Sequence, residues 1–294
     1  MNIKPQKALH LHEDEDKKKP KHVGHRYIVT EKKDGWYGYY DSDDGHIRSR
    51  AGRIIPSLAD VSQDLHKTVQ PKVELLGNFR IIFEILLPEE PNFYTMNGIL
   101  NRKEVIDSSK VELYMHDLLL EDNMTITARG RYTTLSELVR SEWGYCPVYV
   151  QVAHVFTVSE YIDTWKSFAE VVWGSGGEGV ILKRADSLYS SGKRNADLMK
   201  IKEEITLDLL VIGVDEGEGK YQGTTGALIV RDKAGNRHHV SGMTDEQRDL
   251  WWNSQLDIVG SVVEVKAMKV NADGSLREPR FKAIRHDKTS EDID

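Results

Sequence analysis

The side chains best suited to chemistry in this sequence are a lysine beside a tight turn and a carboxylate between two glycines. Lys32 lies in E-K-K-D-G, where a predicted strand ends and the D-G pair opens a turn. Glu178 lies in G-E-G at the start of another predicted strand, where small neighbours leave room for a phosphate or a metal. A carboxylate is a hard oxygen ligand suited to Mg²⁺, and a lysine amine can act as a covalent nucleophile. Each motif taken alone also fits an ordinary surface turn.

Two more lysines and a second carboxylate fit the same chemistry. Lys200 and Lys202 are two residues apart on a predicted strand, so their side chains face the same side. A free lysine has a pKa of about 10.4, so Lys32 needs nearby cations that lower its pKa before the amine is nucleophilic. The alternative is an exposed strand face. Glu84 ends an apolar strand, where a buried unpaired carboxylate is costly, so we expect it to meet a ribose hydroxyl or a metal-bound water unless it lies on the rim.

The order of the motifs is more informative than any one of them. E-K-K-D-G at residues 31–35 is followed by S-R-A-G-R at 49–53, F-E at 83–84, Y-M-H-D at 114–117, G-E-G-V-I-L-K at 177–183, M-K-I-K at 199–202 and R-H-D-K at 285–288. This ordered set resembles the covalent nucleotidyltransferases, and among them the small ATP-dependent DNA ligases of bacteria and bacteriophages. The resemblance extends from about residue 25 to residue 288 and includes S-G-M-T-D-E-Q-R and A-D-G-S-L-R-E-P-R-F.

The resemblance implies an enzyme that seals a 3'-hydroxyl to a 5'-phosphate at a nick. Lys32 would be the catalytic residue that takes AMP from ATP, with Mg²⁺ or Mn²⁺ as the metal. The expected partner is nicked double-stranded DNA, bound by a monomer that does not associate with a membrane. The resemblance places the nucleotide contacts at Thr30, Glu31, Arg50, Glu84, His116, Glu178, Lys183, Lys200, Lys202, Arg285 and Lys288, the metal at Glu178 and Glu84, and DNA contacts at Arg50, Arg53, Arg277 and Arg280.

The sequence departs from the family pattern at two positions. The first motif of these ligases continues to an arginine two residues after its glycine, a ribose and phosphate contact, but Tyr37 stands there. Arg50 or Arg53 is expected to cover part of that role. His116 takes the place where the ligases stack Phe or Tyr on adenine, and a planar imidazole can still stack with less area. The alternative for His116 is a core histidine with satisfied hydrogen bonds.

The last motif contains Arg285, Asp287 and Lys288. In the resembling ligases it swings toward the pyrophosphate during adenylation and then away, which requires a hinge of a few residues. We expect this hinge at Lys202 and Glu203. The alternative is a frayed chain end.

Length and composition bound the fold. The 294 residues exceed one ordinary domain, since single cores stop growing near ~250 to 300 residues. The content of 39% apolar and 30% charged residues argues against disorder. No run approaches the roughly 20 apolar residues of a membrane-spanning helix, and the polar start does not fit a secretory signal, so we expect the cytosol of a bacterium or an infected host. The single Cys146 excludes an intramolecular disulfide and a thiolate metal site.

The charge distribution is uneven. The net charge of -7 is unusual for a nucleic-acid-binding protein, but residues 266–288 carry seven Lys or Arg against three acids, and residues 178–202 carry six against three. Because salt screens charges beyond about 8 Å, such local patches can meet phosphate on an acidic protein. The alternative is that these stretches are solvated faces.

The elements that must position these residues predict an α+β fold in two domains. Strands are expected at 26–32, 36–41, 46–50, 78–87, 110–120, 147–156 and 179–184, with helices over 56–69, 134–143 and 159–173. After residue 202 we expect strands at 205–217, 226–232, 236–243 and 258–270, and one helix whose capping box is Thr244 and Gln247. This predicts a polar, loose leader over residues 1–24, a nucleotidyltransferase domain with mainly antiparallel sheets over 25–203, and a small closed OB-fold barrel over 204–294.

Other functions share parts of this pattern. An RNA capping guanylyltransferase has the lysine motif, the barrel and the terminal R-x-D-K, although the T-D-E-Q-R and D-G-S-L-R-E-P-R-F segments favour a ligase. RNA ligases generally lack the barrel and this ending. A non-catalytic protein that binds nicks or single strands is the alternative from a different class.

Overall fold

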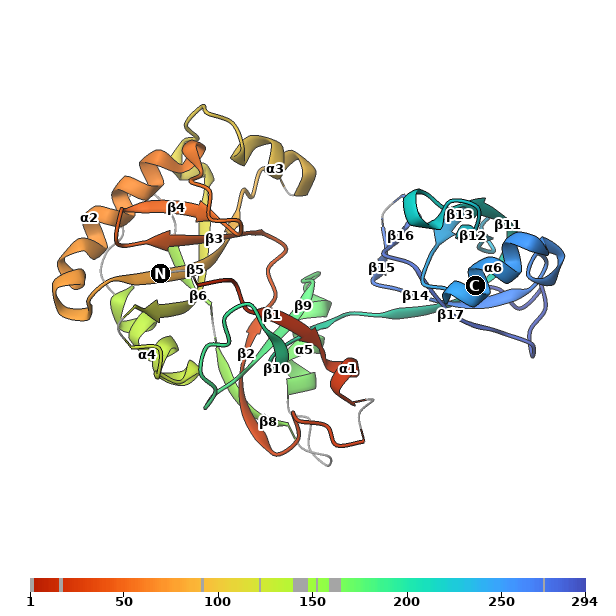
Figure 1. The fold of residues 1–294 in the computed structure, drawn as a ribbon, viewed down its shortest axis with the longest axis horizontal. Helices are drawn as coiled ribbons and strands as arrows, with labels where there is room; N and C mark the ends of the chain where they lie inside the picture. The colour runs from red at the N-terminus through yellow and green to blue at the C-terminus, as the bar shows by residue number, and fades with distance from the viewer. Residues whose placement is uncertain are drawn as a thin grey trace. The chain divides into compact units, whose positions relative to one another are not determined.

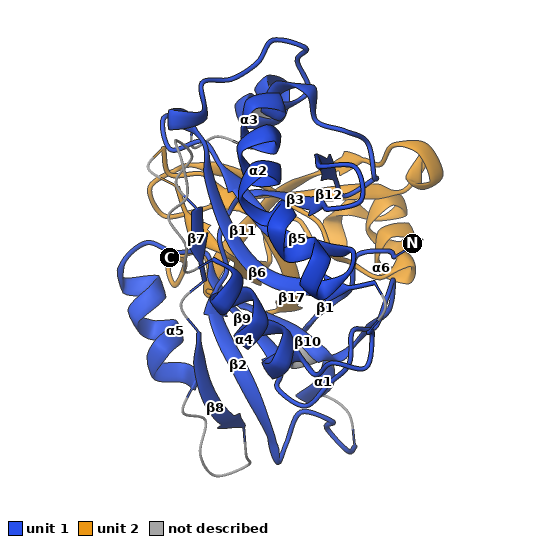
Figure 2. Cartoon of the chain, turned by 90° about the vertical axis from the view of Figure 1, so that its left-hand side faces the viewer, with its two compact units in different colours: residues 1–201 blue, residues 202–294 orange. Residues whose placement is uncertain are grey.

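The computed structural model describes residues 3–15, 18–90, 93–121, 123–139, 148–151, 153–158, 165–271 and 273–294. The chain divides into two compact units, residues 1–201 and 202–294, so the division lies next to the predicted boundary at 203 (Figures 1 and 2). The fold class is confirmed as mixed α+β with mainly antiparallel sheets. None of the helices within the described ranges is long and apolar enough to cross a membrane.

One sheet of the first unit carries Tyr37 and Glu84, two of the residues that the sequence analysis singled out. Its strands are ordered β4 (His46–Ser49), β3 (Trp36–Asp41), β5 (Phe79–Leu86), β6 (Glu112–Leu120) and β7 (Val148–Val150), with β7 parallel to β6 and the other pairs antiparallel. Side chains alternate between faces along each strand. The row Gly38, Phe83 and Met115 therefore faces the buried core, and the row Tyr37, Glu84 and Tyr114 faces the opposite side.

Helices cover the core face of this sheet. They are the 3₁₀ turn η1 (Pro56–Leu58), α2 (Ala59–Leu76), α3 (Phe93–Leu100), the turn η2 (Ser108–Lys110) and α4 (Ala128–Leu138). Leu65 of α2 and Leu135 of α4 are buried in one apolar cluster with the sheet. The predicted helix over 56–69 thus continues to residue 76. The predicted helix over 134–143 begins earlier, where Thr127 accepts a hydrogen bond from the Gly130 N–H as an N-cap; its residues 140–143 lie outside the described residues.

The other sheet of the first unit has the order β1 (Lys7–His10), β10 (Arg194–Lys202), β9 (Gly179–Arg184), β2 (His25–Glu31) and β8 (His154–Val158). Helix α5 (Trp165–Gly174) packs on it, and the short α1 (Leu11–Glu15) follows β1. The predicted helix over 159–173 is found from residue 165, and residues 159–164 lie outside the described residues. The predicted strand over 147–156 is instead two strands, β7 and β8, because the chain passes from one sheet to the other.

The predicted loose leader is wrong for the described residues of this segment. Strand β1 pairs in parallel with β10, and Leu9 and Leu11 are buried in the core of this sheet. The physical reason is that the two leucines alternate with polar residues, so a short half-buried strand is hidden in a polar stretch.

The second unit is a five-stranded antiparallel sheet with the order β13 (Arg237–Val240), β12 (Thr225–Arg231), β11 (Ile205–Glu216), β14 (Val262–Ala267) and β17 (Arg280–Ile284). Smaller elements are the turns η3 (Gly219–Tyr221) and η4 (Gln255–Asp257) and the hairpin β15 (Lys269–Val270) and β16 (Leu276–Arg277). Helix α6 (Asp245–Asn253) begins at Thr244, and the predicted capping box with Gln247 is confirmed.

The prediction of a closed barrel is wrong in this unit. Its sheet is open, and in the described residues its edge strands meet at a single bridge from Ser241 to Arg280, where the Phe281 N–H donates to the Ser241 carbonyl at 2.7 Å. The short β13 offers too few residues for a continuous ladder to β17.

Candidate nucleotide-binding site

Lys32 and Glu178 meet because two neighbouring strands place them. Lys32 follows β2, and its backbone N–H donates to the Gly179 carbonyl at 2.8 Å, which extends the pairing of β2 with β9 by one residue. Glu178 immediately precedes β9. The Lys32 Nζ lies 2.5 Å from the Glu178 Oε2, and the side chains are 23% and 4% exposed. The structure therefore brings together the two residues that the sequence placed 146 positions apart.

The glycine before Glu178 is required by packing. A Cβ on Gly177 would lie 2.5 Å from the Val172 Cγ1, 3.0 Å from the Val172 carbonyl oxygen and 3.4 Å from the Glu31 Oε1. Any side chain there would push β9 away from α5. The G-E-G motif thus lets a carboxylate approach the end of β2.

Glu84 adds a second carboxylate to this group. Burial raises the pKa of Glu84 to about 7, and Lys32 and Arg50 partly oppose that rise, while Glu178 and Asp34 add to it. The charges of the predicted nucleophile, a predicted phosphate-binding arginine and a predicted metal ligand therefore all affect the Glu84 carboxyl group. A bound cation would favour its ionised form.

Glu84 and Glu178 fit a magnesium site of the kind that phosphates complete. Mg²⁺ is commonly held by one or two carboxylates together with substrate phosphates and water. In the described part of the chain, no group of three or more His, Cys, Asp or Glu is arranged to hold a metal.

Arg50 lies over the ring of Tyr37, the residue that departs from the family pattern. The Arg50 Cζ is 4.7 Å from the ring centroid, within the range of a cation–π interaction. Arg48 differs, because it pairs with Asp44 and donates to the Gly52 carbonyl. Burial raises the pKa of Tyr37, so the phenol stays neutral. The exposed guanidinium of Arg50 is thus held above position 37, whereas Arg53 lies in the same loop with its backbone paired to Ser49.

His116 and Lys183 belong to a buried cluster centred on Asp117. Lys183 Nζ lies 2.7 Å from the Asp117 Oδ2 and donates to the His116 carbonyl at 2.9 Å. Arg131 of α4 forms a two-pronged pair with the same carboxylate at 2.8 and 3.2 Å. Burial, helped by Lys183, lowers the pKa of His116 to about 3, so the imidazole is neutral. Arg131 had no sequence signal beyond its place on the buried side of a helix.

The other predicted contacts of the first unit lie along β2 and β10. Thr30 is buried opposite Ile181 of β9. Glu31 pairs with Lys33 at 2.6 Å, and the Lys33 Nζ lies 4.6 Å from the centroid of the Tyr114 ring. Lys200 is on β10 opposite His10 of β1.

Tyr114 stacks on Tyr149 at 5.0 Å between centroids, an aromatic pair beside Lys33 that sequence reasoning missed. The alternating pattern of β6 was the only signal for it, because Tyr149 comes from a different strand.

The remaining predicted residues lie in the second unit. Arg285 donates to both oxygens of Asp208 at 3.0 and 3.1 Å, and Lys288 Nζ lies 2.5 Å from the same carboxylate. A hydrogen bond from Arg285 lowers the pKa of Asp287 to about 2. The segment after this motif is not frayed, since Ile293 is buried and the Asp208 N–H donates to the Asp294 side chain at 2.7 Å.

Lys202 and two of the predicted DNA-binding arginines, Arg277 and Arg280, lie at another place in this unit. Lys202 Nζ is 3.5 Å from Glu278, which also pairs with Arg280 at 3.4 Å. Glu278 has a positive φ of 52°, in the turn between β16 and β17. Arg277 ends β16, opposite Lys269.

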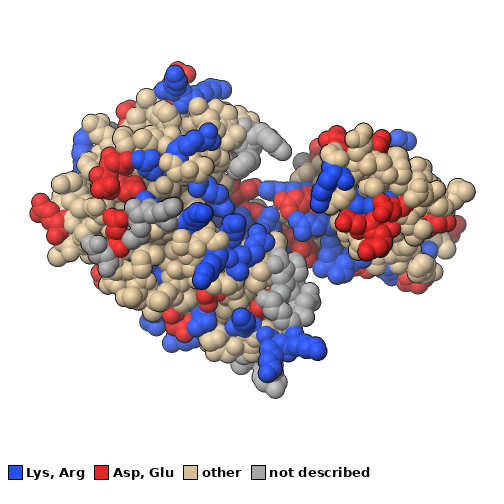
Figure 3. Space-filling view, in the orientation of Figure 1, with Lys and Arg blue, Asp and Glu red and all other residues tan. Residues whose placement is uncertain are grey.

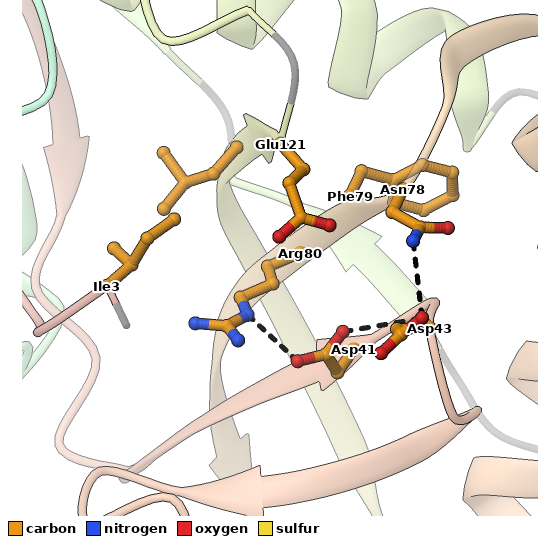
Figure 4. Close-up of a pocket in the computed structure, with 8 residues that line it drawn as sticks. Ile3, Asp41, Asp43, Asn78, Phe79, Arg80 and Glu121 are labelled. Atoms are coloured by element: carbon orange, nitrogen blue, oxygen red, sulfur yellow. Dashed lines mark hydrogen bonds and ion pairs between the residues drawn. The ribbon is translucent and has the colours of Figure 1, made fainter. Parts of the chain in front are cut away.

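A separate small hollow in the first unit is not part of this group (Figure 4). It is lined by Ile3, Asp41, Asp43, Asn78, Phe79, Arg80, Leu119 and Glu121. Asp41 and Arg80 pair at 2.9 Å at the end of β3 opposite to Tyr37. The Asn78 side chain also donates to Asp43 at 3.2 Å, so Asp41 and Asp43 are both engaged in local contacts.

Comparison with known proteins identifies the family. A model described as an ATP dependent DNA ligase domain matches residues 17–202, and one described as a DNA ligase OB-like domain matches residues 216–285. A DNA ligase of Natronomonas pharaonis is 26% identical over 291 residues, covering 87% of this chain and 50% of the relative. A DNA ligase of Thermococcus onnurineus is 28% identical over 228 residues, covering 66% of this chain and 39% of the relative. The chain thus spans half the length or less of these curated relatives.

Solved structures show the same fold at low identity. A structure from a study of Lig E DNA ligases, described as binding DNA with a minimal scaffold, has a TM-score of 0.71 at 22% identity and covers 97% of this chain and 100% of its own. The bacteriophage T7 ATP-dependent DNA ligase in complex with ATP has a TM-score of 0.57 at 17% identity, covering 97% and 100%. Since the ligase-domain model matches more than half of the residues, the chain belongs to the ATP-dependent DNA ligase family.

Proposed function

We propose that this protein seals nicks in duplex DNA by using ATP to form a lysyl-AMP intermediate at Lys32. The observation that carries the proposal is the placement of the Lys32 amine 2.5 Å from Glu178. The charges of Lys32, Glu178 and Arg50 also act on the Glu84 carboxyl group. A positioned amine, a pair of carboxylates and a guanidinium are what transfer of a nucleotidyl group requires. Family membership supports the use of ATP.

In the first step, Lys32 Nζ forms a bond to the α-phosphorus of ATP as the bond to the β-phosphate oxygen breaks. Pyrophosphate leaves, and the amine proton is lost; Glu178 is in hydrogen-bonding contact with Nζ and so is placed to accept it. Glu178 and Glu84 would hold Mg²⁺ or Mn²⁺, which neutralises phosphate charge when bound. Arg50 supplies a guanidinium for the nucleotide or for the nick phosphate, in place of the arginine missing at position 37.

In the later steps, the AMP passes from Lys32 to the 5'-phosphate of the nick, and the 3'-hydroxyl then attacks that phosphate and releases AMP. Positioning supplies much of the acceleration in such transfers. Neutral His116 is proposed to stack on the adenine. Lys200 and Lys202 are proposed to meet phosphates, as are Arg285 and Lys288, which must then exchange Asp208 for pyrophosphate. Lys183 is proposed to meet a phosphate while it keeps its pair with Asp117. Arg53, Arg277 and Arg280 are proposed to contact the DNA backbone, and the cytosol is the proposed location.

Labelling with α-³²P-ATP and Mg²⁺ tests the proposal. Wild type should retain label after denaturation, and Lys32→Ala should retain none, because the phosphoramidate has no other amine in its place. The matched control is Lys33→Ala, which removes the neighbouring lysine and should still take label. Equal labelling of Lys32→Ala and wild type contradicts the assignment of the nucleophile.

The same assay separates the alternatives. Labelling by GTP and not by ATP would indicate an RNA capping guanylyltransferase. Binding of nicked DNA with no adduct and no sealed strand would indicate a non-catalytic nick-binding protein.

A further inference from the structure

The edge of the first unit's β1-containing sheet carries a cluster of four exposed cations that no part of the proposed reaction uses. Lys4 and Lys7 come from the N-terminal segment, and Lys193 and Arg194 come from the start of β10. We call Lys4, Lys7, Lys193 and Arg194 the edge cluster. Figure 3 shows lysine and arginine side chains gathered over β1 and the strands beside it.

Backbone pairing builds this cluster. The Lys7 N–H donates to the Lys193 carbonyl at 2.9 Å, and Lys7 lies opposite Arg194 in the parallel ladder. The Gly192 N–H donates to the Lys4 carbonyl at 3.2 Å, and the Lys4 N–H donates to the Ser191 Oγ at 2.9 Å. The four cations are therefore fixed near one another by main-chain contacts.

No acid of the described residues pairs with the cluster. Among the described residues, none of its four side chains forms an ion pair within 4.0 Å. Asp197, the acid of β10, faces Arg184 at 3.4 Å and accepts a hydrogen bond from Asn195. Gathering like charges without counterions is unfavourable, so a cluster of this kind is stabilised when it meets an anion.

Tyr189 connects the edge cluster to the residues around Asp117. Tyr189 accepts a hydrogen bond from the Gln6 N–H at 2.9 Å and donates to the Lys4 carbonyl at 3.3 Å. The Arg131 Cζ lies 5.7 Å from the centroid of the Tyr189 ring. Tyr189 therefore joins the edge cluster to the cluster in which Asp117 pairs with Arg131 and Lys183.

We propose that the edge cluster is a docking surface for the phosphate backbone of the duplex beside the nick. This proposal rests on the proposed nick-sealing function. It assigns DNA contact to Lys4 and Lys7, which precede the residues 17–202 matched by the ligase-domain model, together with Lys193 and Arg194, which lie within them. Exposed cations at several positions suit a polyanion better than a single small anion, because each one neutralises a separate phosphate.

A different role for the same lysines is protection of a sheet edge, since β1 is the outer strand of its sheet and charged side chains discourage pairing with another chain. The two roles make different predictions. Edge protection affects self-association, whereas backbone docking affects DNA affinity and its dependence on salt.

The test compares two quadruple variants of the full chain by fluorescence anisotropy with a labelled nicked duplex. The first is Lys4→Gln, Lys7→Gln, Lys193→Gln and Arg194→Gln. The matched control also removes three lysines and one arginine from exposed positions of the first unit, as Lys67→Gln, Lys72→Gln, Lys103→Gln and Arg129→Gln. Replacing the three cluster lysines by arginine gives a third variant that keeps the charge.

We expect the first variant to bind at least about tenfold more weakly, since each lost phosphate contact corresponds to roughly fivefold at ~0.15 M salt and lowers the salt slope by about 0.9. The control and the arginine variant should bind within about twofold of wild type. All should take AMP label normally, because that step needs no DNA.

The proposal is overturned if the first variant keeps wild-type affinity and salt slope, or if the control loses as much. New self-association by light scattering at unchanged DNA affinity also overturns it in favour of edge protection. Should the quadruple variant fail to fold, the single variants Lys7→Gln and Arg194→Gln test the proposal by the same measurement, the dependence of DNA affinity on salt. If wild type neither takes label nor seals DNA, nick sealing fails as the function, while the affinity comparison still decides the docking surface.

Discussion

Two buried carboxylates of the first unit hold lysines in different ways. Glu178 pairs with Lys32, whose side chain remains 23% exposed. Asp117 pairs with both Lys183 and Arg131, which are 13% and 4% exposed. Both carboxylates are 4% exposed, so burial of the acid does not distinguish the two places. The two places differ instead in how exposed their cations are.

We interpret this difference as one between the proposed reactive group and a scaffold. Burial of Asp117 opposes its charge, but Lys183 and Arg131 outweigh burial and lower its pKa below the usual range. The cluster joins β6, β9 and α4 through hydrogen bonds from two cations to one carboxylate. The Lys32 pair, in contrast, lies where a strand ends, and an incoming phosphate can reach its amine. We infer that the Asp117 cluster fixes the frame in which the Lys32 pair reacts.

The largest expected effect is on stability, from Asp117→Asn. The substitution leaves Lys183 and Arg131 buried without a counter-charge, so we expect it to lower the free energy of unfolding by about 3 to 5 kcal/mol. Because the folded-state pKa of Asp117 is lowered, its contribution is present above its unfolded pKa and is lost as the pH falls. Urea unfolding at neutral pH measures the change.

The matched control is Asp186→Asn, which breaks the exposed pair with Arg184 at 2.7 Å. Exposed pairs contribute about 1 kcal/mol or less, so this variant should unfold close to wild type. Equal losses in the two variants would mean that the Asp117 cluster is not a scaffold.

The next effect is on the rate of AMP labelling, from Glu178→Gln. The amide keeps the shape but loses the charge that orients Lys32 and would hold a metal, so we expect labelling to slow by about 100-fold with little change in stability. Single-turnover labelling across a range of Mg²⁺ concentrations measures the rate. A variant that labels at the wild-type rate would place the metal and the amine elsewhere.

Much of the arrangement was predictable from local pattern. The strands that carry Glu84 and Lys200, and those that adjoin Lys32 and Glu178, have continuous or alternating apolar residues, and their ends follow from Gly and Asp. Thr244 and Gln247 fixed the start of α6 by a purely local contact. Such features depend on residues within a few positions, which is why a single sequence reveals them.

What could not be predicted depends on contacts between distant segments. Strand β1 exists because β10 offers it an edge and a core for Leu9, and neither is visible in a short polar stretch. The Asp117 cluster joins residues from α4, β6 and β9, and the Tyr37–Arg50 contact joins a strand to a later loop. The length of β13 left the sheet of the second unit open, which strand count alone does not reveal.

A smaller effect should appear in the pH dependence of stability, through Glu84. Burial raises its pKa from 4.5 to about 7, so the folded protein holds a proton that the unfolded chain has released. This stabilisation is fully present below about pH 4.5 and is lost as the pH rises toward 7. Between these limits wild type should lose about 2 kcal/mol relative to Glu84→Gln.

Urea unfolding of both proteins across this pH range measures the difference. The control is Glu74→Gln, which removes an exposed carboxylate on α2 and should follow wild type. If the free energy of unfolding of Glu84→Gln varies with pH in parallel with that of wild type, Glu84 ionises in the folded state as it does in water. The Glu84 carboxyl group would then be more accessible to water than the Asp117 carboxyl group.

The smallest effect concerns the contact between Tyr37 and Arg50. If the Tyr37 ring holds the guanidinium where the nucleotide binds, a double-mutant cycle with Tyr37→Leu and Arg50→Gln should show a coupling of about 0.5 to 1 kcal/mol in the apparent KM for ATP during labelling. Tyr37→Phe keeps the ring and should resemble wild type.

The control pair is Tyr39 and Arg80. The Arg80 Cζ lies 5.1 Å from the Tyr39 ring, and Arg80 also pairs with Asp41 at the far end of the same strand. That pair should leave the KM unchanged, because it is separated from Lys32 along β3. Additive effects of Tyr37→Leu and Arg50→Gln would show that Arg50 acts without the ring, and that the first unit positions its reactive cations only through carboxylates.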